Sequence, residues 1–296
     1  MNGLLVIDKP GGMTSHDVVN RLRKITGERT IGHLGTLDPM ATGVLPLLVG
    51  KYTRLAQYFS AAEKSYTGTI RLGFATDTYD AEGEPAGPDS WPNSAGRVTL
   101  EEVRAVAASF LGESDQMPPP FSAKKIAGTP AYKLARAGKP VELKPAPVRI
   151  DAFEIVALEG AEASFSIEIS SGGYVRSVAH HIGQQLGCGA HLSSLRRTRA
   201  GSFTLDAAHT LPQLEPLAGN IAALEGLCVH PRLLLREMPA VTGDNVARGR
   251  LRNGAQANLP EFSSAELVKV FASPRELVGI AKRVAGTLFQ PVVVLG

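Results

Sequence analysis

Residues 32–43 read Gly-His-Leu-Gly-Thr-Leu-Asp-Pro-Met-Ala-Thr-Gly and are the most informative stretch of this sequence. Three glycines and one proline among twelve residues predict a tightly shaped loop whose backbone can approach a ligand closely. Asp38 lies at its centre, and Pro39 after it has no backbone N–H with which the carboxylate could bond. The carboxylate is therefore expected to face outward, either as a structural turn residue or as a catalytic group.

Apolar segments on both sides of this loop predict a rigid support for it. Residues 44–49 form one apolar run, and residues 3–8 form another that ends in a Lys-Pro-Gly-Gly turn. Short, continuous apolar runs closed by turns are typical of buried strands. The loop is therefore expected to be pinned to the core of the protein.

Further along the chain, strands and amphipathic helices are interspersed. The predicted elements are a helix capped by Thr14 or Ser15, strands at 66–74, 148–156 and 163–170, a helix opened by Thr99 and Glu102 and stopped near Gly112, and a helix at about 174–187. Adjacent strands with separate helices favour an α+β fold with a mixed sheet over a regular βαβ repeat.

Two loop-like segments interrupt this pattern, and short strands replace the longer elements near the C-terminus. Residues 77–96 are rich in Asp, Glu, Gly and Pro and predict an exposed loop, whereas residues 117–147 predict a basic insertion. Short strands at 267–271 and 277–281 predict a small β-barrel. We therefore divide the chain into a first domain at 1–232 and a second at 238–296.

Composition excludes several classes of protein. The chain has 296 residues, of which 44% are hydrophobic and 20% charged, enough for a sizeable core. Its two cysteines, Cys188 and Cys228, form no Cys-x-x-Cys pair, which argues against a disulfide scaffold or a zinc finger. No run reaches 18 apolar residues and the N-terminus does not resemble a signal peptide, so a cytoplasmic protein without a structural metal is expected.

Charge alternates along the chain although the net charge is only +3. Residues 1–60, 121–149 and 231–296 carry +3, +6 and +4, whereas 61–120 and 150–230 carry −6 and −4. Each basic zone alone could be ordinary solvated surface. If the three converge in space, they form a surface that attracts a polyanion such as RNA.

The loop at 32–43 resembles the signature motif of the TruB family of bacterial tRNA pseudouridine synthases, which modify uridine 55 in the T loop. Six further blocks resemble the family and occur in the same order as in the family. They are Lys9-Pro10 and Gly12-Met13-Thr14-Ser15; Lys64-Ser65-Tyr66; Arg71-Leu72-Gly73 and 76–83; 119–125; 171–177; and 187–191 and Leu195-Arg196-Arg197. The resemblance spans roughly residues 9–200. It implies a mixed, largely antiparallel sheet flanked by helices, and a C-terminal PUA-like RNA-binding barrel that matches less clearly.

The resemblance also assigns roles by position. Asp38 would be the catalytic aspartate, Tyr66 the ring that stacks on the target base, and Arg176 the partner of Asp38. Tyr174 and Leu195 would line the pocket, and His33 would lie near the vacated base. The expected RNA-binding lysines are Lys9, Lys64, Lys124 and Lys125, with others in the basic insertion. The family uses no metal and no organic cofactor, and its partner is the T arm of tRNA.

Chemistry and pattern leave alternatives for these residues. A carboxylate in an apolar pocket needs a nearby cation to stay ionised, and Arg176 would supply one. By pattern alone, Tyr66 could be a core aromatic and Arg176 a surface arginine. We interpret Asp77 and Asp80 as part of a solvated acidic loop rather than a metal site, and the isolated histidines as non-ligands.

Two other functions compete with the isomerase. A tRNA-binding or tRNA-folding chaperone would use the same basic zones without chemistry. An aspartate-nucleophile hydrolase would need a second carboxylate near Asp38, which the sequence does not clearly offer. Attack on C1′ or on C6 of the nucleotide stays open, and a monomer with no obligate protein partner is the default expectation.

Overall fold

The computed structural model describes residues 1–91, 98–122 and 143–295, and the backbone of 125–126 and 129–130. Within these residues ten strands form one sheet whose main path runs β12-β1-β3-β10-β4-β9-β8-β5, with β2 paired to β3 and β11 to β10. The strands are β1 (Gly3–Lys9), β2 (Ile31–His33), β3 (Thr42–Val49), β4 (Lys64–Leu72), β5 (Gly112–Gln116), β8 (Ala146–Glu159), β9 (Glu162–Ile169), β10 (Ala190–Ala200), β11 (Phe203–Thr204) and β12 (Ala208–His209). β1 pairs in parallel with β12 and β3 with β10, and the other pairs are antiparallel, which confirms the expected mixed, largely antiparallel sheet.

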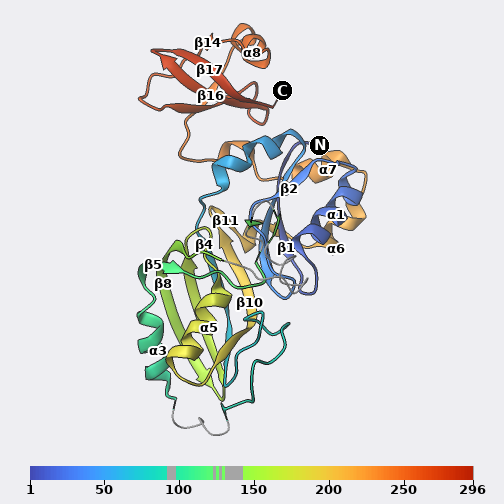
Figure 1. Cartoon of the computed structure of the whole chain (residues 1–296). Helices are drawn as coiled ribbons and strands as arrows, with labels where there is room; N and C mark the ends of the chain where they lie inside the picture. Colours follow the sequence, from blue (N-terminus) through green and yellow to red (C-terminus); the bar gives the residue numbers. More distant parts are fainter. Residues whose placement is uncertain (92–97, 123–124, 127–128, 131–142, 296) are drawn as a thin grey trace.

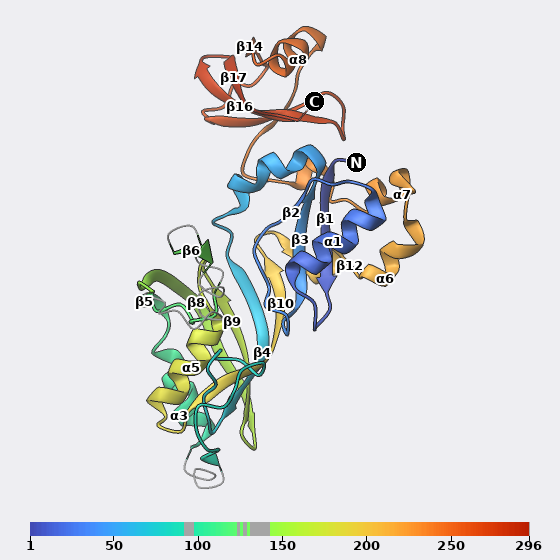
Figure 2. The same cartoon turned by 45° about the vertical axis from the view of Figure 1, so that its right-hand side comes forward.

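Helices cover the sheet at two places (Figures 1 and 2). Near β8, β9 and β10 lie α3 (Leu100–Ala108) and α5 (Val175–Gln185). Around β1 and β2 lie α1 (Ser15–Thr26), α6 (Leu211–Leu214) and α7 (Ile221–Gly226). The connecting 3-10 helices are η1 (Gly50–Phe59), η2 (Leu205–Ala207), η3 (Glu215–Leu217) and η4 (Pro231–Leu233).

The predicted helices and strands before residue 187 all occur, with shifted ends. α1 begins after Thr14, whose hydroxyl accepts from the Asp17 N–H while the Asp17 carboxylate accepts from the Thr14 N–H. This reciprocal cap satisfies two otherwise unpaired N–H groups and fixes the start of the helix. α3 has the same cap, made by Thr99 and Glu102, but it ends at Ala108, before Gly112.

β10 is the one long strand of the sheet that the sequence patterns did not predict. It lies between β3 and β4, yet it carries the polar run Arg196-Arg197-Thr198-Arg199. Arg197 is fully buried there because its guanidinium donates to the carbonyls of Gly35, Thr36 and Val44. A buried charge that is bonded through all three of its nitrogens is compatible with a central strand, although alternation of apolar residues cannot reveal it.

The C-terminal residues form a separate five-stranded sheet in the order β13-β15-β16-β17-β14. Its elements are β13 (Ala240–Thr242), α8 (Asn245–Arg252), β14 (Ala257–Asn258), β15 (Leu267–Phe271), β16 (Leu277–Ala285) and β17 (Leu288–Val294). The predicted strand at 267–271 is confirmed, and the one predicted at 277–281 continues to Ala285.

An apolar cluster joins the two sheets. Phe271 and Ile280 of the small sheet belong to the same buried cluster as Leu4 and Leu48 of the large one. Burial of such side chains is worth about 1.5–3 kcal/mol each, so this shared cluster stabilises the packing of the small sheet on the rest of the protein. In both views it lies at the end of the molecule opposite α3 (Figures 1 and 2).

Two predicted loop regions are only partly covered by the described residues. In the basic insertion at 117–147, β6 (Lys125–Ile126) pairs with β7 (Thr129–Pro130). Residues 123–124, 127–128 and 131–142 lie outside the described part, and Lys124 is among them. The expected exposed loop at 77–96 is exposed at Asp77 but not at Asp80, of which 3% is accessible. For Asp80 the prediction of a solvated carboxylate is wrong.

Candidate active site

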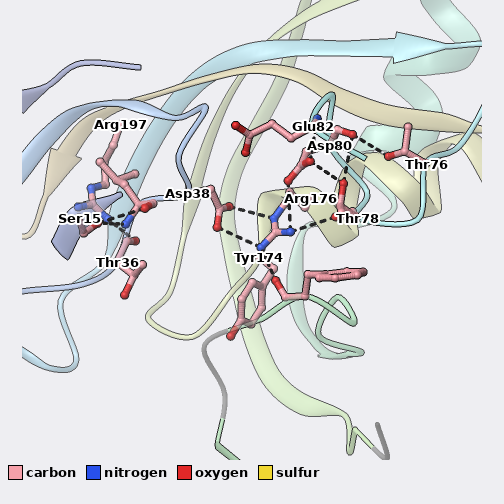
Figure 3. A network of polar contacts seen from close by, with 12 residues as sticks. Ser15, Thr36, Asp38, Thr76, Thr78, Asp80, Glu82, Tyr174, Arg176 and Arg197 are labelled. Atoms are coloured by element: carbon pink, nitrogen blue, oxygen red, sulfur yellow. Dashed lines mark hydrogen bonds and ion pairs between the residues drawn. The ribbon is translucent and has the colours of Figure 1, made fainter. Parts of the chain in front are cut away.

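Asp38 and Arg176 form a two-point ion pair. Nε of Arg176 lies 2.9 Å from Oδ2 of Asp38, and Nη2 of Arg176 donates to Oδ1 at 3.1 Å. Asp38 lies in residues 34–41 between β2 and β3, hereafter the Asp38 loop, and Arg176 lies in the first turn of α5 (Figure 3). The guanidinium is 5% exposed, whereas the carboxylate side chain is 32% exposed. The pair therefore offers its carboxylate, not its cation, to an incoming molecule.

The rest of the Arg176 guanidinium is also occupied. Nη1 lies 3.2 Å from Oδ2 of Asp80 and donates to the carbonyl of Thr78 at 3.0 Å, and Nη2 donates to the carbonyl of Phe121 at 2.9 Å. Two carboxylates beside the N-terminal turn of α5 offset the cost of placing a cation at the positive end of the helix dipole. Five contacts to one planar group leave it little freedom to turn.

Asp80 is itself fixed within residues 76–84, hereafter the 76–84 turn. Its Oδ1 accepts from the Thr78 hydroxyl at 2.6 Å and from the Glu82 N–H at 3.1 Å. Its backbone carbonyl accepts from the Thr76 hydroxyl at 2.7 Å. Figure 3 shows these side chains around Arg176. Sequence reasoning assigned no role to Asp80, although residues 76–83 formed one of the blocks that resemble the family.

The Asp38 loop is held through its backbone. The Ser15 hydroxyl accepts from the Leu37 N–H at 2.8 Å and donates to the Leu37 carbonyl at 3.1 Å. The buried Arg197 donates to the carbonyls of Gly35 and Thr36 at 3.1 and 3.3 Å. Ser15 and Arg197 therefore fix the peptide groups immediately before Asp38, and neither was singled out for a role from the sequence.

Lys9 takes part in the same support. It is fully buried, and its ammonium donates to the carbonyls of Pro10, Met13 and Pro39 at 2.8, 2.6 and 3.1 Å. Burial lowers the pKa of Lys9 to about 8, and the charge of Asp38 acts against that shift. The expectation that Lys9 contacts RNA does not fit this position, which favours a role in tethering the Asp38 loop to β1.

The predicted base-contacting residues lie around the pair. Tyr66 is buried on β4 opposite Arg197; burial raises its pKa, and the charge of Asp38 adds to that shift. Tyr174 directly precedes α5, where its N–H and carbonyl bond to the Gln116 amide at 2.8 and 3.1 Å. Leu195 is 8% exposed on β10, next to the strand β3 that follows the Asp38 loop. The charge of Asp38 also raises the pKa of Tyr174, after the larger effect of burial, so both tyrosines sense this carboxylate.

The remaining predicted site residues are His33 and three lysines, which differ in burial and in contacts. His33 is half-buried at the end of β2, and burial lowers its pKa; no protein partner of its Nδ1 is seen among the described residues. Lys64 donates to the carbonyl of Ala62 at 2.8 Å, and burial lowers its pKa. Of Lys125 only the backbone is described, and Lys124 lies outside the described residues.

Two opposing effects act on the Asp38 carboxyl. Burial raises its pKa above the ordinary value and the charge of Asp80 raises it further, whereas the charge of Arg176 and its hydrogen bond lower it. The expectation that Arg176 opposes desolvation is therefore confirmed. The net direction is upward, so ionisation of Asp38 is sensitive to each charge around it.

Two further features, a metal-binding cluster and a membrane-spanning helix, are absent from the described residues. Within the described part of the chain, no three or more His, Cys, Asp or Glu side chains are grouped to hold a metal ion. No helix among those residues is long and apolar enough to cross a membrane.

Comparison with known proteins agrees with the geometry. Residues 23–175 match the model of the TruB family pseudouridylate synthase N-terminal domain, and residues 176–225 match that of the tRNA pseudouridylate synthase B C-terminal domain. The tRNA pseudouridine synthase B of Solibacter usitatus is 43% identical over the full length of both chains. That of Arthrobacter sp. strain FB24 is 42% identical over 99% of this chain and 96% of its own.

Solved structures give the same answer for the fold. The crystal structure of a Cbf5-Nop10-Gar1 complex contains a chain that is 27% identical, with a TM-score of 0.70 over 99% of this chain and 85% of that one. A chain in the structure of an H/ACA RNP bound to a substrate RNA containing 2′-deoxyuridine gives 25% identity and a TM-score of 0.69. With the two family matches and the full-length relatives, these findings show that the chain belongs to the TruB family of pseudouridylate synthases.

Proposed function

We propose that this protein converts uridine 55 in the T loop of tRNA to pseudouridine, and that the carboxylate of Asp38 attacks the target nucleotide. The observation that carries the proposal is the pairing of a partly exposed carboxylate with a buried arginine. Arginine stays charged at any working pH, so it favours the ionised, nucleophilic form of Asp38 despite the desolvation that acts against it.

The reaction needs no atom beyond those of the nucleotide and the protein side chains. The N1–C1′ bond breaks, the uracil rotates, and a C5–C1′ bond forms; C5 loses a proton and N1 gains one. Attack of Asp38 on C1′ or on C6 fits this balance. Tyr66 would stack on the base, and its raised pKa keeps the phenol protonated at neutral pH, so it could pass a proton when the ring reattaches. Tyr174 and Leu195 would line the pocket that retains the detached uracil.

Access to the base requires extrusion of the target nucleotide from the RNA. Unstacking costs a few kcal/mol, and a flat side chain placed in the gap offsets part of it. We assign that place to His33, whose lowered pKa keeps the imidazole neutral and suited to stacking. Lys64, Lys124 and Lys125 would bind phosphates, with recognition mainly by loop shape.

The C-terminal sheet is proposed to be a PUA-like RNA-binding domain at 238–296, following a catalytic domain at 1–232. Its helix α8 carries Arg248, Arg250 and Arg252, which bond to Ala272, Gln256 and Glu276 within the domain, so phosphates would have to share or replace these contacts. We propose that the protein acts as a monomer in the cytoplasm, without a metal or an organic cofactor. A carboxylate paired with a buried arginine favours the isomerase over a tRNA chaperone, which has no use for such a pair.

Incubation with unmodified tRNA transcript, followed by chemical detection of pseudouridine, tests the proposal. We expect full conversion by the wild type and none above background by Asp38→Asn, which keeps size and polarity but removes the nucleophile. Asp77→Asn, on the exposed side of the 76–84 turn, is the matched control and should convert normally. If wild type and Asp38→Asn bind tRNA and are both inactive, the chaperone is the better account.

A further inference from the structure

The rings of Tyr79 and His180 form a stack that the proposed chemistry does not use. Their centroids lie 3.8 Å apart and their planes are inclined by 13°. Tyr79 lies between Thr78 and Asp80, the two residues of the 76–84 turn that contact Arg176. His180 lies four residues after Arg176 on α5, which places both side chains on the same face of the helix. The stack therefore joins the turn to the helix one helical turn beyond the guanidinium.

The backbone at Tyr79 has an unfavourable conformation. Its φ is 67°, in the left-handed region, and among the described residues only Leu235 shares this feature outside glycine. For a bulky aromatic residue such a φ is a strain that persists only where surrounding contacts enforce it. The conformation has a local result, because it brings the Thr78 carbonyl and the Asp80 carboxylate to the same nitrogen, Nη1 of Arg176, at 3.0 and 3.2 Å.

The backbone contacts of the turn hold its peptide groups but not the Tyr79 ring. The Tyr79 carbonyl accepts from the Leu192 N–H at 3.0 Å, and the Ala81 N–H donates to the Leu192 carbonyl at 3.0 Å. The ring instead lies flat against His180, and the buried Nδ1 of that imidazole has no hydrogen-bond partner among the described residues. Burial lowers the pKa of His180 and the neighbouring His181 adds to this, so a neutral ring faces Tyr79 at neutral pH. His181 contacts His180 edge-on at 5.8 Å between centroids, so the flat stack on Tyr79 is the ring contact that joins the turn to α5.

We propose that His180 is a positioning residue for the isomerisation: by stacking on Tyr79 it holds the left-handed turn that aims Thr78 and Asp80 at Arg176. The inference rests on the proposed roles of Asp38 and Arg176 and adds a residue that touches neither the carboxylate nor the reacting atoms. Without the stack, the turn relaxes towards ordinary φ, its two acceptors separate, and the guanidinium loses the contacts that keep its other edge on Asp38.

The test compares His180→Ala, which removes the ring, with His180→Phe, which keeps a flat ring. For His180→Ala we expect kcat on tRNA transcript to fall about tenfold, with KM changed by less than about twofold, because geometry and not RNA binding is altered. His180→Phe should return to within about threefold of wild type. Tyr79→Ala should resemble His180→Ala, and the double variant should be no worse than either single one.

A pH profile separates positioning from general destabilisation. Since the charge of Arg176 lowers the pKa of Asp38, a guanidinium held less firmly should move the acid limb of kcat to higher pH in His180→Ala than in His180→Phe. Neither variant carries the imidazole, so titration of residue 180 does not enter this comparison. A change that only lowers the folded fraction, measured by thermal unfolding, would reduce the amplitude and leave the limb in place.

Control variants decide what a negative result means. Gln184→Ala, which changes an exposed residue of α5 that carries no ring, should keep near wild-type kcat. Equal kcat for wild type, His180→Ala and Tyr79→Ala, or equal losses in the Ala and Phe variants, would overturn the positioning role. Asp38→Asn is assayed in parallel: if it is inactive while His180→Ala is normal, only the positioning inference fails, whereas an active Asp38→Asn removes the proposed function itself.

Discussion

The Asp38 loop and the 76–84 turn meet at one guanidinium but are held by different kinds of contact. The Asp38 loop is fixed by side chains that hydrogen-bond its backbone: Lys9 and Arg197 donate to it, and Ser15 both accepts and donates. The 76–84 turn presents a carbonyl and a second carboxylate to Arg176. Changes to the uncharged contacts on the loop side should therefore alter the position and stability of Asp38, whereas changes on the turn side should alter its charge environment. Lys9 belongs to both groups, because its charge also lowers the pKa of Asp38.

The largest effect is expected where the two sides meet. In Arg176→Lys the cation is kept but the planar fork is lost, so one ammonium must serve Asp38, Asp80 and two carbonyls. We expect kcat to fall about a hundredfold or more, because reacting groups that are displaced by about 1 Å cost that much. Single-turnover assays on tRNA transcript measure it.

The matched control for this substitution is Arg21→Lys, a surface pair with Glu215 in which both side chains are at least 40% exposed. It should leave kcat unchanged, since exposed pairs contribute about 1 kcal/mol or less and this one is remote from Asp38. Comparable kcat for wild type and Arg176→Lys would mean that charge alone suffices and that the two-point geometry is unimportant.

On the turn side, Asp80→Asn should shift the pH dependence. The Asp80 charge raises the pKa of Asp38, so its removal lowers that pKa and keeps Asp38 ionised at more acidic pH. We expect the acid limb of kcat to move to lower pH, together with a loss of about tenfold at neutral pH as Arg176 loses one ionic contact. A pH series with Asp77→Asn as control measures both, and an upward or absent shift would contradict the assigned electrostatics.

The sequence predicted the Asp38 side of the site better than the Arg176 side. The Gly- and Pro-rich loop, the apolar strands around it and the capped α1 all follow from local rules, and each occurs. Asp80 was misjudged because its surroundings in sequence are acidic and rich in glycine, and only tertiary pairing with Arg176 explains its burial. β10 was missed for a related reason, since the carbonyls that satisfy Arg197 come from residues about 160 positions away. Local sequence patterns indicate which secondary structure a segment prefers. They do not show which distant group will pair with a buried charge.

Ser15→Ala, on the loop side, is expected to have the smallest effect on kcat. The substitution removes a buried hydroxyl that serves both the N–H and the carbonyl of Leu37, and a buried polar group left unpaired costs about 1–3 kcal/mol. The free energy of unfolding from urea titration should fall by that amount, while kcat per folded molecule changes by less than about threefold, because Lys9 and Arg197 still hold the loop.

Ser60→Ala is the control for that measurement, since Ser60 is exposed and donates one bond, to the Gln57 carbonyl. It should change the free energy of unfolding by no more than about 0.5 kcal/mol. Because no charge is altered in Ser15→Ala, the acid limb should stay where it is in wild type, in contrast to Asp80→Asn. A shifted limb in Ser15→Ala would show that an uncharged anchor also sets the ionisation of Asp38, in addition to the charges of Lys9, Arg176 and Asp80. The division between uncharged contacts that place the carboxylate and charges that set its pKa would then no longer hold.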